Sequence, residues 1–235
     1  MSEMTTTPPA PPEPPAPSQS PYLDFGKPFT FVFEDPDWLK KILIGGLFYL
    51  ASFILIGLFF LLGYCAKLAR NVAAGVARPL PEWDNLGDYF VEGLKLAVIA
   101  IIYAIPFVLI FMIPLIGAGI AESVGGSDDF AAAIFGGFGC LMVPVILILV
   151  FWIPVALLFA AVSGRFEEGF NFSAIFGFIK NNFVNYLLAI LIHLVGNFIS
   201  QFGVILLCIG VLFTAFWSML VSTYAFADAY RLRRK

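Results

Sequence analysis

Long stretches without a charged residue alternate with short charged clusters along this chain. No Asp, Glu, Lys or Arg occurs between Lys41 and Lys67, between Lys95 and Glu122, between Asp129 and Arg165, or between Lys180 and Asp228. A helix needs about 20 apolar residues to cross a hydrocarbon core of roughly 30 Å. The pattern therefore predicts an all-α fold, an integral membrane helical bundle in which these stretches cross the bilayer.

The lengths of the four stretches set the number of spans. The first two fit one span each, and the fourth fits two with a turn near Ser200–Gly203. The third is too long for one span and short for two, so we interpret residues 130–140 as an interfacial lead-in to a span over residues 140–163. About five transmembrane helices are expected, and a hairpin in the third stretch raises the number to six.

Composition agrees with a membrane location. Hydrophobic residues make up 60% of the chain and charged residues 12%, against about 45–50% and 25% in ordinary soluble domains. This balance excludes a disordered chain, a nucleic-acid-binding protein and a disulfide scaffold, and it argues against most water-soluble enzymes. The three cysteines form no paired motif and are expected to be free thiols, so no metal or cofactor site is predicted from them.

The chain divides into three parts. Ten of the 16 prolines fall in residues 1–36, which predicts a disordered, Pro-rich N-terminal tail. Residues 37–231 form the helical membrane domain, and residues 232–235 form a basic C-terminal tail. Residues 158–180 follow the order of span, basic exit and surface helix that residues 62–95 also follow, which indicates a faint internal repeat.

Lys and Arg are unevenly distributed between the two sides of a five-span protein. The loops at 65–95 and 164–181 together with the C-terminal tail hold ten, and the other side holds Lys27, Lys40 and Lys41. Cytoplasmic loops are enriched in Lys and Arg. We therefore expect a multi-pass protein of the cell (plasma) membrane with a cytoplasmic C-terminus and an N-terminal tail outside.

The loop between the first two expected spans carries the most distinctive residues of the chain. Pro79 and Pro81 end the first helix, Trp83 supplies an interfacial ring, and Asp84 is expected to cap the helix that follows. Residues 84–95 then read as a short amphipathic helix lying on the membrane surface.

This loop resembles a known family. A span that ends in Gly63-Tyr64, the sequence Leu80-Pro81-Glu82-Trp83-Asp84 and the Gly93-Leu94-Lys95 entry into the next span are similar to the prokaryotic family called domain of unknown function 4013. The resemblance extends over about residues 33–231. It implies a multi-pass membrane protein, and it implies no reaction and no cofactor.

Four carboxylates of this region, Glu82, Asp84, Asp88 and Glu92, could gather a divalent cation at the membrane surface, because hard cations prefer oxygen ligands. The alternative is structural: Glu92 and Lys95 form an i, i+3 pair, and the other carboxylates serve caps and turns. We expect the structural role.

Polar residues recur every four positions on the last two expected spans. His193, Asn197 and Gln201 share one face of the first, and Thr214, Ser218 and Ser222 share one face of the second. Two such stripes on antiparallel neighbours can hydrogen-bond across their seam. The other interpretation is a polar conduit or ligand pocket lined by His193 and Asn197.

The sequence favours a non-enzymatic scaffold or assembly protein whose cytoplasmic surface helices contact lipid headgroups or a protein partner. The Pro-rich tail is a second place where a protein partner could bind. The alternative is a small transporter or channel subunit for a neutral or weakly polar solute, lined by the fourth and fifth spans. Catalysis is the least expected function, because no acid/base pair or metal cluster lies within the predicted spans.

Overall fold

The computed structural model describes residues 21–123, 128–205 and 209–233, and within these ranges the chain is helical with no strand. The longer helices are α2 (Trp38–Ala51), α3 (Ile56–Ala73), α4 (Leu86–Ser123), α5 (Asp128–Ser163), α6 (Phe172–Asn181), α7 (Phe183–Gln201) and α8 (Gly210–Leu232). The short ones are α1 (Lys27–Thr30) and the 3₁₀ segments η1 (Phe31–Glu34), η2 (Ser52–Ile54), η3 (Phe166–Phe170) and η4 (Phe202–Ile205).

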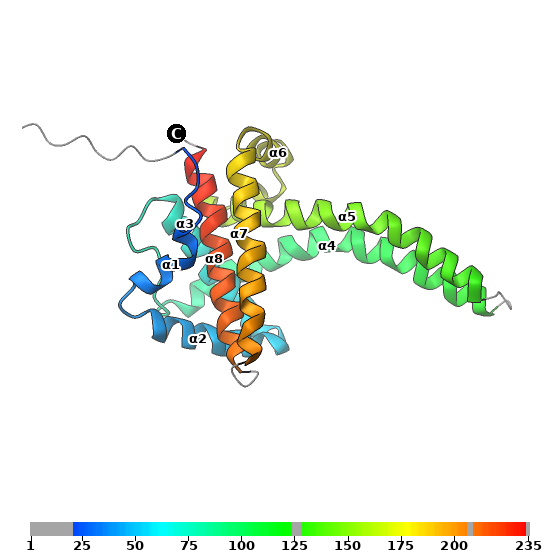
Figure 1. Cartoon of the computed structure of the whole chain (residues 1–235), viewed down its shortest axis with the longest axis horizontal. Coiled ribbons are helices and arrows are strands. Elements are labelled where there is room, and N and C mark those ends of the chain that lie inside the picture. The colour runs from blue at the N-terminus through cyan, green and yellow to red at the C-terminus, as the bar shows by residue number, and fades with distance from the viewer. Residues whose placement is uncertain (1–20, 124–127, 206–208, 234–235) are drawn as a thin grey trace, which may run out of the picture.

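The antiparallel pair α7 and α8 forms the centre of the molecule, as Figure 1 shows. Helices α2 and α3 pack against α8, and α2 lies across its lower part. Helices α4 and α5 form a long hairpin that points away from this centre (Figure 1). The N-terminal segment lies on the other side of α8 from this hairpin (Figure 1).

Four helical segments are long and apolar enough to cross a membrane. They are Ile56–Ala73, Leu86–Gly117, Phe183–Ile205 and Gly210–Leu232. Helix α5 contributes a further apolar stretch, Phe151–Ser163. The expectation of an all-α, multi-pass membrane protein is therefore confirmed.

The first expected span is wrong in its bounds, because the chain turns in the middle of it. Leu55 has φ 66° and separates η2 from α3. Helix α2 has 14 residues, about 21 Å at 1.5 Å per residue, and is too short to cross a 30 Å core. The turn consists of apolar residues and Ser52, so the charge pattern did not reveal it, and the spanning helix α3 extends beyond Lys67 and Arg70.

Two further boundaries differ from the prediction. Residues 86–95 are not a separate surface helix, because they continue without a break into α4, which has 38 residues. Residues 130–140 are likewise part of α5 and not an interfacial lead-in. A short amphipathic helix does occur after α5, where α6 buries Ile175 and Phe178 and exposes Phe172 and Phe176. The two copies of the faint internal repeat are residues 62–95 and 158–180, and only the second copy thus has a separate surface helix.

The N-terminal segment packs against the bundle well before residue 37. The predicted tail ends at residue 36 and its first 20 residues lie outside the described part, but Leu23 is buried and its N–H donates to Asn185 Oδ1 at 2.9 Å. The Phe31 ring lies 4.4 Å from that of Tyr224 on α8.

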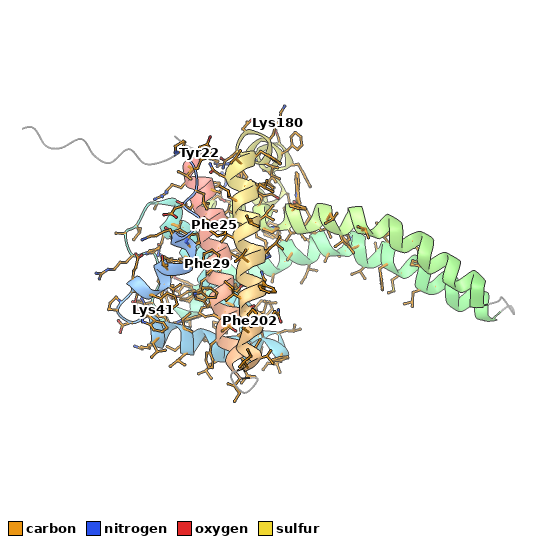
Figure 2. All side chains as sticks on the ribbon, in the orientation of Figure 1. Tyr22, Phe25, Phe29, Lys41, Lys180 and Phe202 are labelled. Carbon is orange, nitrogen blue, oxygen red and sulfur yellow. The ribbon has the colours of Figure 1, made fainter. Side chains whose placement is uncertain are left out.

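These contacts bring the described start of the chain to the same end of the molecule as the end of α8. In Figure 2, Tyr22 and Lys180 lie at this end and Phe202 lies at the opposite one. Helix α2 lies across the bundle and is too short to add a crossing. The expected sides of the two tails stay a prediction, because residues 1–20 and 234–235 lie outside the described part of the chain.

Helices α3 and α4 approach closely where glycines face a backbone. A Cβ added at Gly93 would overlap the carbonyl oxygen of Phe59, and one added at Gly63 would overlap that of Tyr89. Small residues allow such close contact between membrane helices, where packing replaces the hydrophobic driving force. Gly93, a residue of the family-like sequence, therefore serves helix packing.

We predict that Gly93→Ala lowers the free energy of unfolding by roughly 1–3 kcal/mol or more, because the two helices must move apart. Gly87→Ala is the matched control: it lies in the same helix with nothing within 4 Å of the added Cβ, and it should be neutral or stabilising by up to about 1 kcal/mol. Unfolding midpoints in detergent test this, and equal losses for the two variants contradict it.

Candidate functional site

Residues 80–83 of the family-like loop close over a buried lysine. Lys41 is 2% exposed, and its Nζ lies 2.7 Å from Asp35 Oδ2 and 2.6 Å from Glu82 Oε1. The same ammonium donates to the carbonyl of Leu80 at 3.4 Å. We call Asp35, Lys41 and Glu82 the ionic clasp, because they join the N-terminal segment, α2 and the loop.

The clasp holds Lys41 in its charged form. Burial lowers the pKa of its ammonium, but the hydrogen bonds and negative charges of Asp35 and Glu82 outweigh burial and raise the pKa above its ordinary value of 10.5. Removing one member of a buried ion pair leaves the other charge without compensation, which is strongly destabilising. The clasp is therefore a structural element.

Trp83 was expected as an interfacial ring, and the structure instead packs it into an aromatic cluster. Its ring stacks on Tyr64 at 4.1 Å and on Phe48 at 4.9 Å between centroids. Its Nε1–H donates to the carbonyl of Lys41 at 3.1 Å, and the Tyr64 hydroxyl donates to the carbonyl of Pro81 at 2.8 Å. The loop is thus held against α2 and α3 by rings and backbone hydrogen bonds.

Asp84 does not cap α4. The helix begins at Leu86, so Asn85 takes the cap position and its amide donates to Asp88. Glu92 pairs with Lys95 at 3.5 Å, as expected, and also with Arg70 of α3. In the described residues no three His, Cys, Asp or Glu side chains come close enough together to hold a metal ion.

The polar stripes meet at a cavity of about 460 Å³ between α3, α5, α7 and α8. Five of the six residues predicted from the stripes line it: His193, Asn197, Gln201, Ser218 and Ser222. The other walls are mainly apolar, with small residues on α3 and leucine and alanine on α5. They include Leu62, Cys65, Ala66, Ala69, Pro154, Leu157, Leu158 and Ala161.

A hydrogen bond joins the two stripes inside the cavity. His193 Nδ1 and Ser222 Oγ lie 2.7 Å apart, and the tautomer of the imidazole decides which of them donates. The Ser222 Oγ also lies 2.8 Å from the carbonyl oxygen of Ser218. The Asn197 amide donates to the carbonyl of His193 at 2.9 Å.

Ser218 differs from the other hydroxyl residues of α8. Thr214, Ser222 and Thr223 each donate to the carbonyl four residues earlier, at 3.1, 2.8 and 2.8 Å. Ser218 is 2% exposed, and its Oγ makes no hydrogen bond within the described part of the chain. The Oγ has almost no accessible surface and lies beside Gly196 of α7, where an added Cβ would stand 3.3 Å from it, so this hydroxyl is enclosed in the α7–α8 interface.

Thr214 lies outside the cavity and acts as the predicted structural contact between the stripes. Its hydroxyl donates to the carbonyl of Ser200 on α7 at 2.8 Å. Asn185, which continues the α7 stripe, bonds to Pro21 and Leu23 of the N-terminal segment. The stripes are therefore structural at their ends and line the cavity at their centre.

Sequence reasoning missed the α3 and α5 walls and Asp35. The α3 residues 62, 65, 66 and 69 follow the spacing of one helical face, but that spacing does not reveal which helix they face. Asp35 and Glu82 are 47 positions apart in the sequence, and no local pattern joins them.

The comparisons agree with the resemblance seen in the sequence. The model of a family described as "Protein of unknown function (DUF4013)" matches residues 46–231, and the chain belongs to this family. No curated protein and no solved structure matches it.

We predict that Lys41→Met destabilises the protein by roughly 3–5 kcal/mol, because Asp35 stays buried without its partner. Lys40→Met is the control, since Lys40 is the exposed neighbour, and it should change stability by less than about 0.5 kcal/mol. Adding Asp35→Asn to Lys41→Met should restore part of the loss in a chemical unfolding experiment.

The clasp also predicts a dependence on pH. Because the Lys41 pKa is raised in the folded state, its stabilisation is complete below about pH 10.5 and is lost as the pH rises through the folded pKa. The double variant should lack this alkaline loss. The same alkaline profile in the double variant and the wild type would show that another group causes it.

Proposed function

We propose that this member of the family is a non-enzymatic membrane protein that binds a small neutral or weakly polar molecule in the cavity, as a carrier or channel subunit. The observation that carries the proposal is the convergence of uncharged hydrogen-bonding groups on an otherwise apolar cavity of about 460 Å³. Pockets that hold small molecules have volumes of roughly 300–1,000 Å³ and a few convergent polar groups.

The chemistry of the walls supports a neutral ligand. None of the described lining residues is an Asp, Glu, Lys or Arg. A charged ligand would leave water without a compensating charge, which is costly in an apolar environment. Hydroxyl and amide groups, by contrast, can replace the hydrogen bonds that a neutral polar group loses on leaving water.

The surroundings of His193 and Ser222 support a binding role over catalysis. In a catalytic triad, a carboxylate orients the histidine that activates the serine. No Asp or Glu is among the described residues that line the cavity.

The alternative function is a scaffold or assembly role, which the surface of α6 favours. Phe172 and Phe176 are 57% and 59% exposed on this short helix, which could contact lipid headgroups or a protein partner. Lys180 and the basic end of α8 lie at the same end of the molecule. We propose that this end faces the cytoplasm at the plasma membrane, because the positive-inside rule applies to such clusters.

The test is transport by the purified protein in liposomes, with glycerol and a fluorescent monoacylglycerol as two uncharged probes. We predict that His193→Leu with Asn197→Leu reduces movement of at least one probe by roughly tenfold, because the hydrogen bonds offered by the cavity are lost. Stopped-flow light scattering and chemical quenching of the outer leaflet measure the two rates.

Thr214→Val is the matched control, because Thr214 belongs to the stripes but lies outside the cavity. It should lower the unfolding midpoint and leave transport unchanged. If the double variant lowers only the midpoint while neither probe's rate changes, the stripes are structural and the scaffold role stands instead.

A further inference from the structure

We propose that the molecule held in the cavity is a neutral lipid with an oxygen-bearing head group, and that it enters sideways from the bilayer between α5 and α7. This inference rests on the proposed function and narrows its ligand to one chemical class. Three observations carry it: the position of the cavity mouth, the limited packing between α5 and α7, and the separation of polar from apolar walls.

Asn197 and Gln201 identify the hydrogen-bonding part of the ligand. Both residues line the cavity, and both are exposed. A side-chain amide offers two N–H donors and one carbonyl acceptor. These amides can therefore bond to an oxygen that enters the cavity, such as an ester carbonyl or an alcohol.

The mouth of the cavity lies on the side of α7. Asn197 and Gln201 are the exposed residues among its walls, and both belong to a helix long enough to span the membrane. The residues beside them are apolar and exposed, with Leu194 at 56% and Phe198 at 67%. A mouth surrounded by such residues opens to lipid.

A gap between two helices provides the path. Helix α5 packs against α3, α4 and α8, and α7 packs against α6 and α8, but α5 and α7 form no packed interface in the described residues. They are joined at one level, where the Tyr186 hydroxyl donates to the carbonyl of Phe151. Asn197 and Gln201 lie about three and four helical turns from Tyr186 along α7, so this contact leaves the mouth open.

The two sides of the cavity differ in polarity, as the two parts of a lipid do. Polar side chains come from α7 and α8, and the opposite walls on α3 and α5 are formed mainly by Leu and Ala. A head group bonded to Asn197 and Gln201 would place its hydrocarbon chain against Leu62, Ala66 and Leu157. The volume of about 460 Å³ accommodates a compact head and part of one chain.

The described walls of the cavity carry no charged side chain, and this distinguishes the expected lipid from the common membrane phospholipids. A phosphate or carboxylate head would find no Lys or Arg on the described walls, and an ammonium head would find no Asp or Glu. Uncharged heads such as those of monoacylglycerols and long-chain alcohols avoid the free-energy cost of burying a charge without a partner. Selection by charge is therefore a direct prediction of the wall chemistry.

Photolabelling of the full-length protein in phospholipid nanodiscs tests the inference. The probe is monooleoylglycerol with a diazirine in its chain, and labelled peptides are identified by mass spectrometry. We expect labels on the α3 and α5 walls of the cavity. Unlabelled monooleoylglycerol should compete well, and oleate and hexadecane should compete poorly, because one has a charged head and the other has none.

Gln201→Leu is the key variant. It removes the hydrogen-bonding groups of one amide at the mouth, and it should weaken competition by monooleoylglycerol about two- to tenfold. Thr214→Val should leave competition unchanged while lowering the unfolding midpoint. Equal competition by hexadecane, or an unchanged result for Gln201→Leu, overturns the role of the amides at the mouth. Equal competition by oleate overturns selection by charge.

The outcome also separates this inference from the proposed function. If the cavity is not labelled while glycerol transport still depends on His193 and Asn197, lateral lipid binding is wrong and the neutral-solute function stands. If labelling is absent and neither transport probe depends on the stripe, both proposals fail. Labelling of the cavity that unlabelled monooleoylglycerol displaces less well in Gln201→Leu supports both.

Discussion

Hydrogen bonding in the absence of water constrains the centre of this protein more than any other interaction. Polar groups in a lipid-embedded helix must find partners within the protein or in a bound molecule. Several side chains of the α7–α8 pair meet this condition: Thr214 bonds across to α7, Ser222 and Thr223 bond to their own helix, and His193 bonds to Ser222. Asn197 and Gln201 of α7 line the cavity, where a bound molecule can be their partner.

The surrounding elements keep this cavity open by holding the helices in fixed positions. Gly63 and Gly93 set α3 close to α4, and the ionic clasp with the Trp83 cluster fixes the loop between them to α2. Helix α2 in turn packs on α8 through Gly45 and Gly46, which lie against Phe216 and Phe213. The family-like loop thus acts at a distance, by positioning the helices that line the cavity.

Much of this arrangement follows from the sequence, and the failures have a common cause. The charge-free stretches predicted α4, α7 and α8, and four-residue spacing correctly placed His193, Asn197 and Gln201 on one face. Hydropathy could not find the turn at Leu55, because the turn is itself apolar. Spacing could not find the partners of Lys41 or the α3 wall, because contacts between distant segments depend on packing that no local pattern records.

An experimental structure of the full-length protein in lipid nanodiscs tests the central claim most directly. The account predicts elongated density in the cavity, with an atom within hydrogen-bond distance of the Asn197 or Gln201 side chain and a chain running along the α3 and α5 walls. A closed cavity, or an open one without elongated density, would contradict it.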